Sequence, residues 1–204
     1  MWIDISQTLK QGIATWPGDQ PYVYQMDSQL DGETGANVGS IKMSLHTGTH
    51  LDAPFHYDHE GVTIDEIDIN RLIGEAQVIE LIDEEIVTQK LLEDFVIDKP
   101  IVLFKSVYSK EQSVFLGDFM TFESAAIHYL GDLGVEVIGT DMPSIDTVDN
   151  ETLDAHKACL ENQILIIENL ELNKVRVGYY DFIGLPLKIE ADASPIRAVV
   201  KKKL

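Results

Sequence analysis

The sequence predicts an α/β protein with a mixed sheet, folded as one domain over residues 1–204. Two observations support this class. Short runs of β-branched and other apolar residues alternate with segments of helical periodicity, a pattern typical of a sheet covered by helices. The composition is even along the chain, with 45% hydrophobic residues and no repeat, low-complexity tract or flexible linker. Such a chain can bury a core without disulfides or a structural metal.

Five short apolar runs are the expected strands, at residues 76–82, 101–104, 135–138, 164–167 and 196–200. Three intervening segments have helical periodicity, at 84–95, 121–133 and 152–160. Residues 11–40 are rich in turn signals, such as Trp16-Pro17-Gly18-Asp19, and are expected to form an irregular loop. Loops of this kind often carry functional residues.

The charge balance excludes several classes of partner. The chain has 15 Lys and Arg residues against 35 Asp and Glu, which gives a formal net charge of −20. Nucleic acids and anionic membrane surfaces both require a basic face, so neither is an expected partner. The single cysteine, Cys159, cannot form an internal disulfide, and no apolar run approaches the length of a membrane span or a signal peptide. We therefore expect a cytoplasmic protein.

Four potential metal ligands lie within one short stretch of the chain: His46, His50, Asp52 and His56. Their even spacing places them on one side of an extended chain, and Gly48 and Pro54 disfavour a helix there. Imidazole nitrogens and a carboxylate form a ligand set that zinc, manganese and other borderline divalent ions accept. Mixed nitrogen and oxygen ligands favour an open catalytic site over a closed structural one. The alternative is a set of polar residues on a solvated face.

Two further residues are candidate ligands. Glu168 ends the apolar run 164–167, where an ionised carboxylate is costly to bury unless it is paired or bound to metal. His156 lies on the apolar side of its predicted helix, beside Leu153 and Leu160. Taken singly, Glu168 is equally compatible with a strand end that faces water, and His156 with a hydrogen-bonded core histidine.

The chain resembles the kynurenine formamidases, within the wider metal-dependent cyclase-like hydrolases. The central motif is His-x-Gly-Thr-His-x-Asp-Ala-Pro-x-His at residues 46–56. The likeness extends over essentially the whole chain, through segments at residues 16–19, 139–141, 153–156, 168–170, 185–188 and 191–195.

The resemblance implies a swivelling β/β/α fold, a homodimer and a two-metal centre usually built with Zn²⁺. By this resemblance, one ion would be held by His46, His50 and Asp52. Asp52 would bridge to a second ion held by His156 and Glu168. His56 would act beside the metals as general acid and base, while His59 is not part of the motif and is expected in a solvated loop.

The implied reaction is the hydrolysis of N-formyl-L-kynurenine to L-kynurenine and formate in tryptophan degradation. A metal-activated water would attack the formyl carbonyl of this small-molecule substrate. Trp16 is the expected aryl-binding residue, with Phe55 and Tyr57 as further candidates, and Asp141 either lies near the pocket or caps a strand end. Two alternatives remain: hydrolysis of a cyclic amide such as isatin, and a non-catalytic metal-binding protein.

Overall fold

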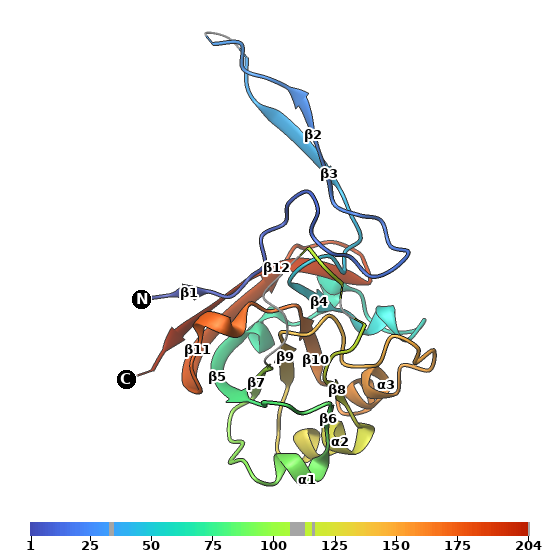
Figure 1. The fold of residues 1–204 in the computed structure, drawn as a ribbon, viewed down its shortest axis with the longest axis vertical. Helices are drawn as coiled ribbons and strands as arrows, with labels where there is room; N and C mark the ends of the chain where they lie inside the picture. Colours follow the sequence, from blue (N-terminus) through green and yellow to red (C-terminus); the bar gives the residue numbers. More distant parts are fainter. Residues whose placement is uncertain (33–34, 107–112, 116, 204) are drawn as a thin grey trace.

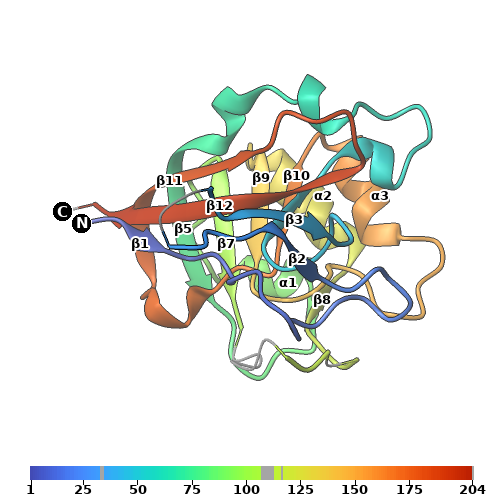
Figure 2. The same ribbon diagram turned by 90° about the horizontal axis from the view of Figure 1, so that it is seen from above.

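A computed structural model describes residues 1–32, 35–106, 113–115 and 117–203. Its main feature is a mixed sheet that curls into a barrel (Figures 1 and 2). Along the sheet, the strand order is β1-β12-β11-β5-β7-β9-β10-β4. The strands are β1 (Ile3–Asp4), β4 (His50–Asp52), β5 (Ile73–Glu80), β7 (Ile101–Lys105), β9 (Val137–Thr140), β10 (Leu165–Glu168), β11 (Gly178–Pro186) and β12 (Ala193–Lys202).

The short strand β4 closes the barrel. It pairs antiparallel with β10 on one side and with the first residues of β12 on the other. The four strands β5, β7, β9 and β10 are parallel to one another, whereas β11 and β12 are antiparallel to their neighbours. The predicted mixed α/β sheet is therefore confirmed.

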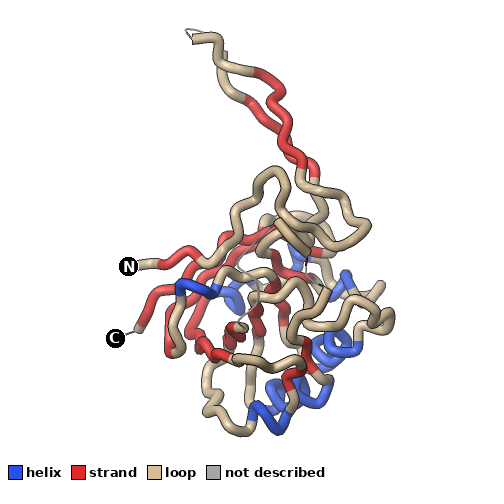
Figure 3. The backbone as a smooth tube through the Cα atoms, in the orientation of Figure 1, coloured by secondary structure: helices blue, strands red, loops and turns tan. Residues whose placement is uncertain are grey.

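Alternation along the parallel strands separates two hydrophobic cores. In β7, Ile101 and Leu103 pack inside the barrel with residues of β11 and β12, whereas Val102 and Phe104 pack outside it. The outer core is covered by α1 (Gln89–Leu92), α2 (Ser124–Asp132) and α3 (Asp154–Glu161), which lie together on one side of the sheet (Figure 3). Both faces of these strands are buried, which explains why they read as continuous apolar runs.

The secondary structure differs from the sequence prediction at three places. All five predicted strands are present, but the helix predicted at 84–95 is wrong in its first half, where β6 (Ile86–Val87) pairs with β8 (Thr121–Phe122). The same pairing shortens the helix predicted at 121–133, which begins at Ser124. Strand β11 was not predicted at all.

The third difference lies in the segment expected to be an irregular loop. Its β2 (Val23–Ser28) and β3 (Val38–Lys42) form an antiparallel hairpin that projects from the barrel as an arm (Figure 1). All residues of both strands are exposed. Short 3₁₀ turns complete the described structure: η1 (Pro54–His56), η2 (Ile64–Glu66), η3 (Ile69–Leu72) and η4 (Leu172–Lys174). In the ranges described above, no helix has the length and apolar character needed to cross a membrane.

We predict that Gly61→Ala destabilises the turn that carries His56. A Cβ on Gly61 would lie 2.6 Å from the backbone nitrogen of Phe55, so the backbone must shift. Overpacking of this kind costs about 1–3 kcal/mol, and the melting temperature should fall by several degrees. Gly74→Ala is the matched control, because a Cβ there would meet only Ile101, at an ordinary 3.7 Å. Equal melting temperatures for the two variants would contradict this assignment.

Candidate metal centre

Strand register brings the predicted ligands together on the outer face of the barrel. His50 in β4 lies directly opposite Glu168 in β10, and Asp52 lies opposite Ile166, which belongs to the outer core. Both His50 and Asp52 therefore face α3, which supplies His156. The extended and turned conformation predicted for residues 46–56 is observed as β4 followed by the 3₁₀ turn η1.

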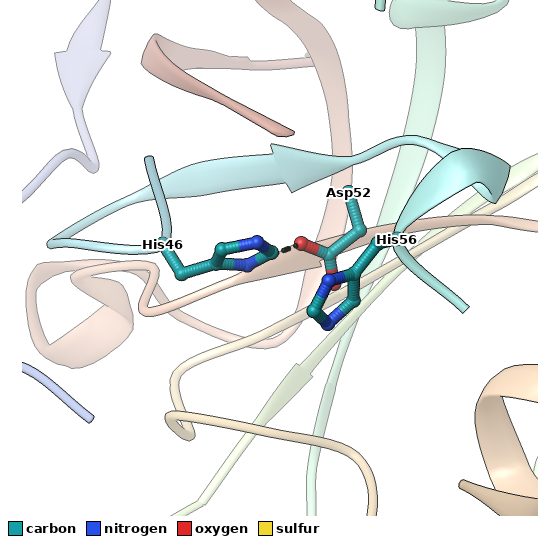
Figure 4. Close-up of side chains that lie close together, drawn as sticks. All are labelled: His46, Asp52 and His56. Carbon is teal, nitrogen blue, oxygen red and sulfur yellow. Dashed lines mark ion pairs between the residues drawn. The ribbon is translucent and has the colours of Figure 1, made fainter. Parts of the chain in front are cut away.

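Asp52 lies at the middle of the cluster and is completely buried. Its Oδ1 lies 3.0 Å from His46 Nδ1 and 3.3 Å from His50 Nε2, and its Oδ2 lies 3.7 Å from His156 Nε2. Glu168 closes the other side, with Oε2 3.4 Å from His50 Nε2 and Oε1 3.6 Å from His156 Nε2. Figure 4 shows the imidazoles of His46 and His56 converging on the Asp52 carboxylate.

Each of the three histidines that face Asp52 is held through its outer ring nitrogen. His50 Nδ1 donates to the carbonyl oxygen of Gly48 at 2.8 Å. His156 Nδ1 lies 2.7 Å from Asp146 Oδ2, and His46 Nε2 lies 2.9 Å from Asp192 Oδ2. A carbonyl or carboxylate oxygen accepts a proton from one ring nitrogen, so the other nitrogen keeps its lone pair and points to the cluster. This arrangement orients histidine ligands in metalloproteins.

Gly48 makes the His50 contact possible. Its φ of +68° lies in the left-handed region, and a Cβ would meet Leu9 Cδ2 at 2.9 Å. The strand that follows is tied down by Thr49, whose hydroxyl donates to the carbonyl of Asn169 at 2.6 Å and accepts from the backbone N–H of Gln7 at 2.8 Å. These bonds fix the start of β4 against the end of β10.

The inner atoms of the cluster fit a cation. His50 Nε2 and both carboxylate oxygens of Asp52 are buried, yet none of the three has a hydrogen-bond partner among the described residues. Buried polar atoms are almost always hydrogen-bonded, and convergence without hydrogen bonds is expected of ligands that share an ion. The described residues contain two groups of potential ligands, and within each group the ligand atoms all lie within 4.8 Å of one another. One group is His46, Asp52 and His56, and the other is His50, Asp52 and Glu168. Asp52 belongs to both groups.

The electrostatics of the cluster require positive charge. Burial alone would lower the pKa of each imidazole, but the carboxylates outweigh it and raise the pKa of His46 to about 9 and those of His50 and His156 to about 10. The pKa of Asp52 lies well below its usual value despite burial, chiefly because of His50. The pKa of Glu168 is raised by burial and by the charge of Asp52. A divalent cation would supply the same charge and release protons on binding.

A cavity of about 560 Å³ opens beside the cluster. His46, His56, His156 and Glu168 line one part of it. Trp16 lines another part, and its ring meets that of Phe115 edge to face with centroids 5.2 Å apart. The cavity therefore joins a polar, ligand-rich end to an aromatic wall, as expected of a site for a small aryl compound.

The other residues considered from the sequence fall in different places. His59 is exposed in a loop, as expected, and Phe55 is exposed and does not line the cavity. Tyr57 packs against the outer core, and Cys159 is buried there, with the pKa of its thiol raised by burial. For Asp141, the sequence left open whether it caps a strand end or lies near the pocket. It does both, because it accepts from the Ser106 backbone N–H and lines the cavity.

Two aspartates that contact the cluster histidines, Asp146 and Asp192, were not predicted from the sequence. Asp146 is buried, and besides His156 Nδ1 it accepts from the backbone N–H groups of Ala155 and His156 and from the amide of Asn150. Asp192 lies just before β12, far from its partner His46 in the chain. No local spacing links either pair, although Asp192 lies within a segment that carried the family resemblance.

The fold and the ligand cluster together define a cyclase-type protein, and the comparisons with known proteins agree. The model of the Cyclase family, described as "Putative cyclase", matches residues 3–147. A solved structure of a potential metal-dependent hydrolase with cyclase activity superposes with a TM-score of 0.87 at 26% identity, covering 100% of this chain and 99% of the other. A predicted metal-dependent hydrolase from Bacillus stearothermophilus gives a TM-score of 0.84 at 27% identity, covering 98% and 97%.

The particular branch is shown by curated relatives. Kynurenine formamidases from Bacillus cytotoxicus and Bacillus cereus strain ZK are each 39% identical over 202 residues, covering 98% of this chain and 97% of the relative. The chain therefore belongs to the Cyclase family and, within it, to the kynurenine formamidases. Isatin hydrolase A from Labrenzia aggregata shares the fold, with a TM-score of 0.85, but only 21% identity over 98% of this chain and 93% of its own.

We predict that Asp146→Asn weakens metal binding about 10- to 100-fold. Asp146 Oδ2 accepts from the backbone N–H and the ring Nδ1 of His156, and Oδ1 accepts from the backbone N–H of Ala155 and the side-chain amide of Asn150. In the asparagine variant, the NH₂ group must therefore face a hydrogen-bond donor on one side. Zinc affinity measured by chelator competition checks this. Asp149→Asn is the control, because among the described residues the Asp149 side chain accepts only from the hydroxyl of the exposed Thr147. Unchanged affinity in Asp146→Asn would show that Asp146 does not orient His156.

Proposed function

We propose that this protein hydrolyses N-formyl-L-kynurenine to L-kynurenine and formate, as an arylformamidase of tryptophan degradation. The proposal rests chiefly on 39% identity to kynurenine formamidases over 98% of the chain. The ligand cluster beside an aromatic-walled cavity supports it. Isatin hydrolysis is supported by a shared fold alone.

The cluster would hold two divalent ions, zinc by family likeness, and Asp52 would serve as a ligand for both. His46 and His50 face Oδ1 of Asp52 and would hold the first ion. His156 faces Oδ2 and would hold the second together with Glu168. When bound, such ions lower the pKa of a water ligand from about 16 to about 7 and stabilise negative charge on a carbonyl oxygen.

His56 would transfer the proton. Its side chain lines the cavity, and its ring centroid lies 4.1 Å from that of His46 and 6.0 Å from that of His156. Burial, together with the charges of those two histidines, lowers the pKa of His56 to about 4, so the imidazole is neutral at pH 7. A neutral imidazole can accept the proton of the attacking water and deliver it to the aniline nitrogen as the C–N bond breaks.

The aryl ring of the substrate would lie against Trp16 and Phe115. Both rings line the cavity and meet edge to face, which gives it an apolar corner, and aromatic side chains of this kind bind planar rings. In this proposal Trp16 is a substrate-binding residue, on a loop that precedes the β2–β3 arm.

We also propose a cytoplasmic homodimer. Family likeness supports the dimer, and the β2–β3 arm is consistent with it. Tyr24 pairs across the hairpin with Ile41 and lies beside Met26, which gives the arm one apolar face that is exposed within this chain. An isolated two-stranded hairpin is only marginally stable in water, so a partner surface would stabilise it. The single cysteine suits a reducing compartment.

The central test is hydrolysis of N-formyl-L-kynurenine by the purified protein as isolated, after chelation and after zinc is restored. We expect activity to vanish with the chelator and to return with zinc, because the nucleophile depends on the ions. Formation of kynurenine can be followed by its absorbance. Failure to hydrolyse the substrate with metal restored would refute the formamidase assignment and turn the search to isatin-like rings.

A second prediction concerns His56. His56→Ala should lower kcat by about 10²-fold or more, with metal content near that of the wild type, because the residue moves a proton and holds no ion. Metal analysis and turnover are measured on the same preparations. His59→Ala is the matched control, because His59 is exposed three residues further along the chain. Loss of metal from His56→Ala would instead make His56 a ligand, as its proximity to His46 and Asp52 permits.

A further inference from the structure

The cavity contains a carboxylate that the hydrolytic chemistry does not use. Asp141 follows the last residue of β9, and its two oxygens accept from the backbone N–H of Ser106 at 3.0 and 3.1 Å. It lines the same cavity as Trp16 and His56. A carboxylate has about four acceptor sites, so the hydrogen bonds that cap the end of β7 do not use all of them.

Asp141 lies close to the ligand cluster along the barrel edge without belonging to it. It follows β9, which pairs in parallel with β10, the strand that ends in Glu168. The segments after the two strands stay side by side, because the N–H of Asn169 donates to the carbonyl of Met142 at 2.9 Å. Among the described residues, Asp141 makes no ion pair with the cluster histidines. A ligand in the cavity could therefore contact the ligand cluster and Asp141 at the same time.

The walls of the cavity favour a positively charged group. Within the described part of the chain, no lysine or arginine lines it, whereas Asp19, Asp141, Glu151 and Asp192 do. Burial raises the pKa of Asp141 to about 6, although hydrogen bonds from Ser106 and the charge of Lys105, which pairs with Glu80, act in the opposite direction. A cationic ligand in the cavity would stabilise the ionised carboxylate further.

We propose that Asp141 binds the α-ammonium group of the substrate and thereby selects formyl-aryl amides that carry a cationic amine. This inference rests on the proposed function. With the formyl group at the ligand cluster and the ring against Trp16 and Phe115, the amino-acid side arm extends along the cavity wall. A charge-assisted hydrogen bond from the ammonium to Asp141 would fix its position.

The test compares two substrates and two variants. The substrates are N-formyl-L-kynurenine and its des-amino analogue, which keeps the formamide, ring, ketone and carboxylate. Asp141→Asn keeps the size of the side chain and an acceptor for Ser106, but removes the charge. We expect it to lower kcat/KM for N-formyl-L-kynurenine about 10- to 100-fold and to change that of the analogue less than about threefold. Glu151→Gln removes a charge from the same cavity and controls for long-range electrostatics.

If Asp141→Asn lowers kcat/KM equally for both substrates, the inference is overturned, because Asp141 would then act only as a structural cap. Similar effects of the two variants would overturn it as well. If Asp141→Asn fails to fold, the wild type still decides: equal kcat/KM for the two substrates would refute ammonium recognition while leaving the formamidase activity established. No turnover of either substrate by zinc-loaded wild type would instead refute the proposed function, and this inference with it.

Discussion

The completely buried carboxylate of Asp52 is the constraint on which the rest of the structure depends. An ionised carboxylate away from water costs several kcal/mol unless opposite charge surrounds it. Here three imidazoles from two chain segments face it, while its own oxygens lack hydrogen-bond partners among the described residues. The fold must therefore hold those segments rigidly, and it does so by closing the barrel with β4, the strand that carries Asp52 itself. The strand pairing that closes the barrel therefore also brings the site residues together.

Hydrogen bonds behind the cluster orient the histidine side chains toward Asp52. The outer nitrogens of His46, His50 and His156 are fixed by an aspartate, a backbone carbonyl and another aspartate, respectively. The two aspartates differ in burial and in the number of groups they bind. Asp146 is buried and accepts from four groups, whereas Asp192 is more exposed and contacts His46 at the edge of the cavity. The His156 side of the centre therefore has the more extensive hydrogen-bonded support.

The sequence was informative where one local feature determines the structure. Doubly buried parallel strands read as apolar runs, and the ligands of β4 share one short motif, so both could be predicted. Glu168 and His156 could be suspected, because a charge at the end of an apolar strand and a histidine on an apolar helix face need an explanation. Asp146 could not, because its partner lies ten residues away across a loop whose path only the fold defines.

The errors in secondary structure have similar causes. In β11, buried Tyr180 and Phe182 alternate with more exposed residues, a period of two that Asp181, the two glycines and the final proline obscure. Ile86 and Val87 fit a helical face, but long-range pairing with β8 makes them a strand. The arm was missed because its turn-rich flanks resemble a loop, and its strands pair only with each other. In each case a tertiary or cross-strand contact overrides the local pattern.

The candidate metal ligands and the residues of the cavity wall lie on different parts of the fold. The potential ligands His50, Asp52, Glu168 and His156 lie on strands of the barrel and on α3, where a change would disturb strand pairing or the charge balance around Asp52. The cavity walls come largely from loops, through residues such as Trp16, Phe115, Val148 and Glu151, which can vary at little cost to the barrel. A protein named isatin hydrolase A accordingly retains this fold at 21% identity. Specificity in this chain must be sought in its loops.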